Sequence, residues 1–118
     1  VSDAWVVSSV SWQVFFFFFV KFRQILNELI NNNRKDRQRL GALLQAGDTD
    51  KLVELAHRIK GAARVVKGEQ LVKRCRALEV ACTDPEASVV SLEASVAGVE
   101  GAIDDLEQAL LSFQQGGA

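Results

Sequence analysis

One stretch of the chain, "ELAHRIKGAARVVKGE" at residues 54–69, places potentially reactive side chains at helical spacing. It contains the only histidine, His57, which is followed by Lys60, Gly61 and Arg64. At about 100° per residue, these four positions share one side of a helix. The other side is apolar and consists of Leu52, Leu55, Ala56, Ile59, Ala62, Ala63 and Val66. Because the apolar side faces a core, we expect the imidazole of His57 to point into solvent.

The neighbours of His57 suit the transfer of an anionic group. Two cations beside a histidine disfavour its protonated form and so leave a neutral, nucleophilic imidazole near pH 7. If the ring acquires a phosphoryl group, Lys60 and Arg64 become its counter-charges. Gly61 costs a helix about 1 kcal/mol relative to alanine, and its missing side chain leaves room for another protein. This pattern predicts a carrier site, with an ordinary solvated helix face as the alternative.

Composition and charge narrow the class of protein. The chain has 118 residues with 48% hydrophobic and 25% charged side chains, which is typical of one globular domain covering residues 1–118. Its net charge of −1 gives no reason to expect nucleic acid or an anionic membrane as partner. Cys75 and Cys82 are seven residues apart, about 10 Å along a helix, which is too far for a disulfide. Free thiols favour the cytoplasm, and no close pairs of ligands support a zinc site.

The apolar periodicity predicts an all-α protein, an antiparallel up-down four-helix bundle over residues 21–115. The polar run "NNNRKD" at residues 31–36 is expected to break or kink the first bundle helix. Gly47 ends that helix, and Asp48 or Thr49 caps the histidine helix, which runs to about Val66.

Two further helices complete the predicted bundle. After a turn at Gly68, a helix from about Glu69 to Cys82 carries both cysteines on its inner side. "TDPE" at residues 83–86 then predicts the start of the last helix, with Thr83 or Asp84 as cap. The last helix is apolar at steps of three and four, at Val89, Leu92, Val96, Val99, Ile103, Leu106, Leu110 and Phe113.

The first twenty residues are atypical, because five consecutive phenylalanines, Phe15–Phe19, cover every side of a helix. The segment lacks the basic start and the cleavage pattern of a signal peptide. Its apolar run from Val14 to Val20 is well short of the roughly 20 residues that span a bilayer, so we expect no membrane insertion. We expect residues 1–20 to form an additional N-terminal helix that caps the bundle. A patch for a partner protein and a sequence irregularity are the alternatives.

The stretch "AHRIKGAARVV…LVKRCRALE" resembles the histidine-containing phosphotransfer (Hpt) domains at the C-terminus of hybrid sensor kinases. The hallmark of that family is His-x-x-Lys-Gly on an exposed helix face, here His57, Lys60 and Gly61. A glycine, an apolar residue, a cysteine and a closing Leu-Glu follow, at Gly68, Leu71, Cys75, Leu78 and Glu79. The family glycine often stands one place earlier, where this chain has Lys67. The resemblance is specific over about residues 40–83 and absent before residue 20.

The resemblance implies that His57 accepts a phosphoryl group from an aspartate of one receiver domain and passes it to another. It implies reaction at Nε2, although the sequence alone does not choose between the ring nitrogens. Glu79 is expected to hydrogen-bond the ring and fix its tautomer, beside Lys60 and Arg64 as cations. The alternative for Glu79 is an exposed charge on the surface of its helix.

A carrier of this kind needs a partner protein to complete its active site. The chain shows no acidic metal-binding cluster, so Mg²⁺ is expected on the receiver and no cofactor is expected here. We expect the docking surface to include Gly61, Val53, Arg58 and Gly68. The expected partners are response-regulator receiver domains and a hybrid sensor kinase, with the chain itself a monomer and not an enzyme on its own.

Two other functions compete with the carrier. The autophosphorylating domain of a sensor kinase also exposes a histidine, but it usually follows the histidine with an acidic residue, where this chain has Arg58. A helical interaction or dimerisation module without chemistry would instead use the phenylalanine run or the seam of the last helix. An independent enzyme is disfavoured because no serine or cysteine is placed beside His57 as a nucleophilic partner.

Overall fold

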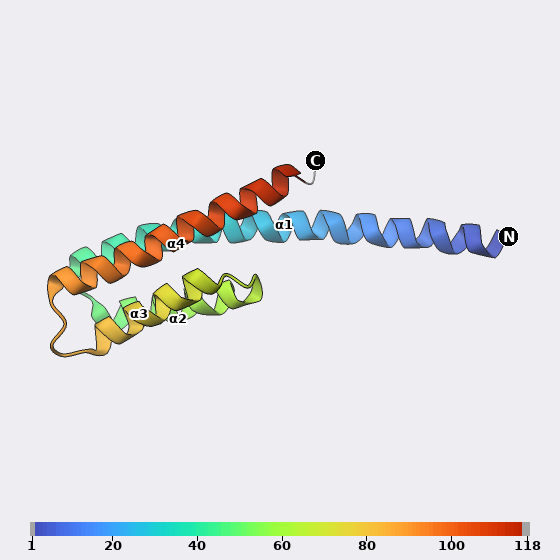
Figure 1. Ribbon diagram of the computed structural model, residues 1–118. Coiled ribbons are helices and arrows are strands. Elements are labelled where there is room, and N and C mark those ends of the chain that lie inside the picture. The colour runs from blue at the N-terminus through green and yellow to red at the C-terminus, as the bar shows by residue number, and fades with distance from the viewer. Residues whose placement is uncertain (1, 117–118) are drawn as a thin grey trace.

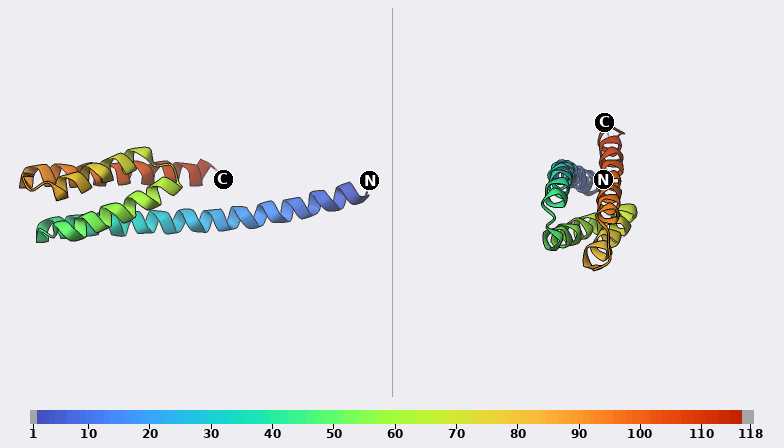
Figure 2. Two further views of the ribbon diagram at one scale, coloured as in Figure 1. Left: turned by 90° about the horizontal axis from the view of Figure 1, so that it is seen from below. Right: turned by 90° about the vertical axis from the view of Figure 1, so that its left-hand side faces the viewer.

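The computed structural model describes residues 2–116, with side chains described for residues 11–115. Within that range the chain forms four helices: α1 (Ser2–Ala46), α2 (Thr49–Val65), α3 (Glu69–Thr83) and α4 (Val89–Gly116). Each helix packs antiparallel to the next, and α1 also packs against α4 (Figure 1). Viewed along the bundle axis, the helices occupy four corners (Figure 2). The all-α antiparallel architecture predicted from periodicity is confirmed.

The break considered at residues 31–36 is wrong, because α1 is one continuous helix through this polar run. Asn33 in this run is buried. Two ion pairs join the run to neighbouring helices: Arg34 bonds the Glu107 carboxylate of α4 at 2.6 Å, and Asp36 pairs with Arg58 of α2. These contacts with neighbouring helices override the weak helix propensity of the asparagines.

The additional N-terminal helix is also not found, because the first residues extend α1 rather than forming a separate element. α1 continues well past the end of α4 and gives the molecule a length of 72 Å (Figure 1). Residues 11–25 are all exposed, including Trp12 and Phe15–Phe19, so this segment does not cap the bundle. We call residues 11–25 the aromatic arm. Within the described part of the chain, no helix has an apolar stretch sufficient to span a bilayer.

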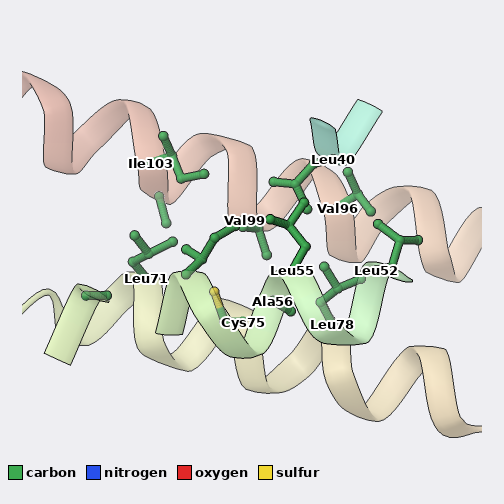
Figure 3. Packing of buried hydrophobic residues seen from close by; sticks show 13 residues of the cluster. Leu40, Leu52, Leu55, Ala56, Leu71, Cys75, Leu78, Val96, Val99 and Ile103 are labelled. Atoms are coloured by element: carbon green, nitrogen blue, oxygen red, sulfur yellow. The ribbon is translucent and has the colours of Figure 1, made fainter. Parts of the chain in front are cut away.

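The core lies between all four helices. Its largest fully buried side chains come from α1 (Leu40), α2 (Leu52, Ile59), α3 (Leu71, Cys75, Leu78) and α4 (Val96, Val99, Ile103). Figure 3 labels most of them. A smaller cluster of Leu26, Ile30 and Leu110 joins α1 to α4 beyond the main core. The predicted seam of α4 is confirmed in its middle, whereas Val89 and Phe113 at its ends are exposed.

The turn between α1 and α2 follows the sequence prediction. Gly47 adopts a left-handed φ of 68°, which glycine tolerates and which ends α1. The Asp48 side chain then accepts a hydrogen bond of 3.1 Å from the Lys51 amide and caps α2. This turn fixes the start of the helix that carries His57.

The predicted cap of α4 is wrong, and this helix starts several residues later than expected. Asp84 accepts a hydrogen bond from the Glu86 amide, and this local turn leaves the chain outside a helix. Ser88 caps α4 instead, because its Oγ accepts a hydrogen bond of 3.1 Å from the Ser91 amide. The turn of residues 84–88 thus separates α3 from α4.

Candidate functional site

His57 lies on the exposed face of α2, as the sequence predicted. Its neighbours Leu55, Ala56 and Ile59 are buried and fix the rotation of α2, so the imidazole is turned away from the core. With the backbone held by this packing, the ring is presented to solvent at a defined place. That geometry suits a nucleophile that acts on another molecule.

Gly61 lies one turn from His57 and is open to solvent. Apart from the backbone of its own helical turns, a Cβ at this position would meet no described atom within 4 Å, so the fold itself does not require glycine there. Gly41 and Gly101 are equally open, so openness alone does not distinguish Gly61. What distinguishes Gly61 is its place one turn from the only histidine, because the absence of a side chain at Gly61 leaves the imidazole accessible from that side.

Lys60 departs from the sequence prediction of a free cation beside His57. Only 8% of the residue is exposed, and its Nζ lies 2.8 Å from Oε1 and 3.1 Å from Oε2 of Glu79 on α3. Its position on α2 borders the core on the α3 side, and the long alkyl chain is buried along that border. Lys60 therefore joins two helices rather than standing free on the face of His57.

Glu79 is half-buried, and Lys60 engages its carboxylate. The hydrogen bond runs to Oε2, while Oε1 is buried close to Nζ without a hydrogen bond of suitable angle. Among the described side chains, no hydrogen bond links Glu79 to the imidazole of His57. The structure thus gives the carboxylate a partner other than the ring that sequence reasoning expected.

Arg64 is the cation that remains on the face of His57. It is exposed and, within the described residues, takes part in no ion pair. It lies two turns after His57, about 10 Å along the helix axis. The Arg64 side chain also lines a hollow at the α2–α3 turn, together with residues of α3.

Two other expected docking residues have structural contacts. The Arg58 guanidinium bonds Asp36 of α1, and burial raises the pKa of the Asp36 carboxyl while Arg58 and Arg39 lower it. A Cβ at Gly68 would lie 3.4 Å from the Ala63 carbonyl oxygen and 3.5 Å from Leu106 Cδ2. Gly68 therefore allows the α2–α3 turn to approach α4. Val53 is half-buried on the His57 side of α2.

Sequence reasoning missed the role of Lys67 in the α2–α3 turn. Lys67 is the non-glycine residue with positive φ in the described chain, at 56°, whereas Gly68 has a φ of −78°. The left-handed conformation thus falls one residue before the glycine. A signal was present in the sequence, because the resemblance described above implies a glycine where this chain has Lys67.

The described residues include no group of three or more potential metal ligands. Both cysteines are free, and Cys75 is fully buried in the core. Burial, together with the nearby Glu79 carboxylate, raises the pKa of the Cys75 thiol to about 12, so it is protonated at neutral pH and inert. The accessible reactive group of this face is the imidazole of His57.

Comparison with known proteins agrees with this geometry. A family model described as "Hpt domain" matches residues 24–112. The virulence sensor protein BvgS of Bordetella bronchiseptica is 50% identical over 44 residues, and that of Bordetella pertussis is 48% identical over 44 residues. Each match covers 37% of this chain but only 4% of the sensor protein. No solved structure matches the chain.

Proposed function

Because the chain belongs to the Hpt domain family, we propose that His57 is the residue through which it carries a phosphoryl group. Hpt domains take part in histidine phosphotransfer within phosphorelays, as phosphoryl carriers and not as kinases. The observation that supports His57 most directly is its exposure beside the open position of Gly61. It is also the only histidine in the chain.

In the proposed reaction, a receiver domain presents a phosphorylated aspartate to His57. The lone pair of Nε2 attacks phosphorus, the new N–P bond forms, and the P–O bond to the aspartate breaks, releasing a carboxylate. The proton on Nδ1 stays on the ring during attack. The reverse sequence transfers the group to the aspartate of a second receiver, so neither direction needs a further reactant.

The receiver is expected to supply the charge compensation that this chain lacks. Phosphoryl transfer depends on positioning and on neutralising charge on the equatorial oxygens, commonly with Mg²⁺ held by carboxylates. We place that Mg²⁺ on the receiver. From this chain, Arg64 is the cation available to the phosphoryl group, and the Lys60–Glu79 pair positions α2 against α3.

The receiver is proposed to dock over the exposed face of α2. Gly61 gives its loops room beside the imidazole, and Val53 offers apolar contact one turn before His57. The similarity to virulence sensor proteins supports a hybrid sensor kinase as the upstream source of phosphate.

Labelled phosphate tests the assignment. Receiver domains are phosphorylated with a labelled small-molecule donor and mixed with the chain or with His57→Gln. We expect acid-labile, alkali-stable label on the chain and none on the variant, with equal helicity of both proteins by circular dichroism. Label persisting on His57→Gln, or no transfer from any receiver of a broad panel, would refute the proposal.

A parallel incubation separates the carrier from an autophosphorylating domain. Labelled ATP and Mg²⁺ are supplied without a receiver, and we expect no label on His57. Incorporation under these conditions would assign the chain to the kinase class instead.

A further inference from the structure

Residues of α2, of α3 and of the turn between them line a hollow of about 370 Å³, which we call the basic hollow. Four exposed cations line it: Arg64, Lys67, Lys73 and Arg76. Gly68 and Val72 also line it, and Glu69 is the carboxylate among its lining residues. The hollow lies at the α2–α3 turn, on the side of the bundle toward which His57 points.

The positive charge of the basic hollow is not neutralised within the fold. None of its four cations forms an ion pair with any side chain described for residues 11–115. Glu79, the carboxylate one turn along α3 from Arg76, is already bound by Lys60. The ion pair between the helices therefore leaves Arg64 and Arg76 free to bind an external anion.

One of these cations occupies a conformation that costs the fold stability. Lys67 has a φ of 56°, and a side chain in the left-handed region costs roughly 1 kcal/mol or more relative to glycine. A lysine that only solvates the surface would offer nothing in return for that cost. A lysine in this strained conformation therefore supports a role of the Lys67 charge in binding another molecule.

One helix of the bundle, α4, is charged in the opposite sense. α4 contains five carboxylates and no lysine or arginine, although the net charge of the chain is only −1. α4 packs against α1 and α3, whereas α2 packs against α1 and α3 from the opposite corner. The acidic helix and the helix of His57 thus lie diagonally across the bundle (Figure 2). A partner with an acidic face will be attracted to the His57 side and repelled from α4.

We propose that the basic hollow is a second contact site for the docked receiver and binds an acidic loop of that receiver beside its phosphorylated aspartate. The proposal rests on the proposed function, since it requires a receiver bound at His57. Arg64 begins the hollow about 10 Å from His57 along α2, well inside a standard interface of about 800 Å² per partner. The hollow therefore selects receivers by the charge of one loop.

The test measures single-turnover phosphotransfer while the concentration of the receiver is varied. The donor is the phosphorylated receiver domain that labels the unchanged chain fastest in the panel. The test variant is Lys73→Glu with Arg76→Glu, which leaves Arg64 and the His57 face intact. The matched control is Lys21→Glu with Arg23→Glu, an equal charge reversal on exposed residues of the aromatic arm. Thermal unfolding shows that each protein is folded before it is used.

We expect the half-saturating receiver concentration to rise at least tenfold in the test variant, with the saturating rate within about threefold of the original. The control should change by less than twofold. The salt dependence of half-saturation should also be shallower in the test variant, because fewer charges are screened.

Three results would overturn the inference. One is an unchanged half-saturating concentration, and another is an equal effect of both variants, which would report net charge alone. A fall in the saturating rate only would place Lys73 and Arg76 at the chemical step instead of in docking. Each of these leaves the phosphoacceptor role of His57 standing, whereas failure of every receiver to label the chain removes both proposals.

Discussion

The Lys60–Glu79 ion pair joins α2 to α3 close to the exposed imidazole. Removal of Glu79 leaves the largely buried charge of Lys60 uncompensated, which is more costly than the loss of a surface pair. We expect Glu79→Gln to lower the free energy of unfolding by about 2 kcal/mol, measured by urea denaturation. This figure is below the range for fully buried pairs because the Glu79 side chain is 24% exposed.

An exposed ion pair of the same protein provides the control for this prediction. Arg37 and Asp104 lie 3.2 Å apart, with both side chains about half exposed. Asp104→Asn should change the free energy of unfolding by less than about 0.5 kcal/mol. Equal effects of the two substitutions would mean that the Lys60–Glu79 pair has no special structural role.

The Cys75 thiol predicts a loss of stability at alkaline pH. Its pKa is about 12 in the fold against an ordinary value of 9.0, mainly because of burial. Between these values the unfolded chain releases the thiol proton and the folded chain retains it. The contribution of this thiol to the free energy of unfolding is therefore fully present below pH 9. It is lost as the pH rises above 9, by about 1.4 kcal/mol per pH unit.

Urea denaturation of the chain and of Cys75→Ala at pH 8, 9, 10 and 11 measures this slope. The variant is less stable at pH 8 because it leaves a cavity, but its stability should fall less steeply above pH 9. Parallel curves for the two proteins would show that Cys75 does not titrate as its burial implies.

For single residues, the sequence predicted the exposure of His57 and Gly61 correctly, because both positions lie far from the apolar stripe of α2. The predicted exposure of Lys60 was wrong, because Lys60 borders the apolar stripe and is buried. Whether such a residue is free or buried depends on the neighbouring helix, and periodicity along one helix does not contain that information. Lys60 and Glu79 are 19 residues apart in the sequence, and only the packing of α2 on α3 brings them together.

Among the elements, the α2–α3 turn makes the most specific prediction. Lys67→Gly should stabilise the protein by about 1 kcal/mol, because glycine adopts the left-handed φ of this position without steric cost. Lys35→Gly is the matched control, since Lys35 is exposed inside α1 and glycine there should destabilise by about 1 kcal/mol.

Thermal or urea denaturation of both variants compares the same substitution in two backbone conformations. Opposite signs are expected. If both variants lose stability, the backbone of Lys67 does not impose the strain that its φ implies.

The helix boundaries show where local patterns were sufficient. Gly47 and Asp48 were predicted correctly, because a C-terminal glycine and a capping carboxylate act through their own backbone neighbours. The break at residues 31–36 was wrong, since contacts of Arg34 and Asp36 with other helices outweigh a local preference. The start of α4 was wrong because Asp84 bonds within a turn, which its sequence also permits.

In the whole molecule, most of the aromatic arm projects beyond the bundle, although the ring of Phe22 packs edge-on against Phe113 of α4, with centroids 5.7 Å apart. All of its side chains are exposed, and the nearest buried residue of α1 is Leu26. So large an exposed apolar surface favours association with another apolar surface. It also fits the alternative of an interaction module, which need not exclude a carrier site on α2.

Deletion of residues 1–20 separates these two properties. The main core and the cluster of Leu26, Ile30 and Leu110 remain, so we expect the midpoint of thermal unfolding to stay within about 4 °C. Phosphoryl acceptance at His57 should be retained, because α2 and α3 keep all their contacts. Sedimentation velocity of both proteins, over a range of concentrations, should show less self-association in the shortened chain.

Results that differ from these expectations would each identify a different part of the molecule as responsible. A drop of more than about 8 °C would mean that the arm stabilises the bundle by at least about 1 kcal/mol, although its side chains are exposed. A dimer that survives the deletion would instead place self-association on the bundle, with the seam of α4 as its first candidate. Phosphoryl acceptance lost together with a dimer would make the carrier site dependent on assembly, contrary to the single exposed face on which His57 stands.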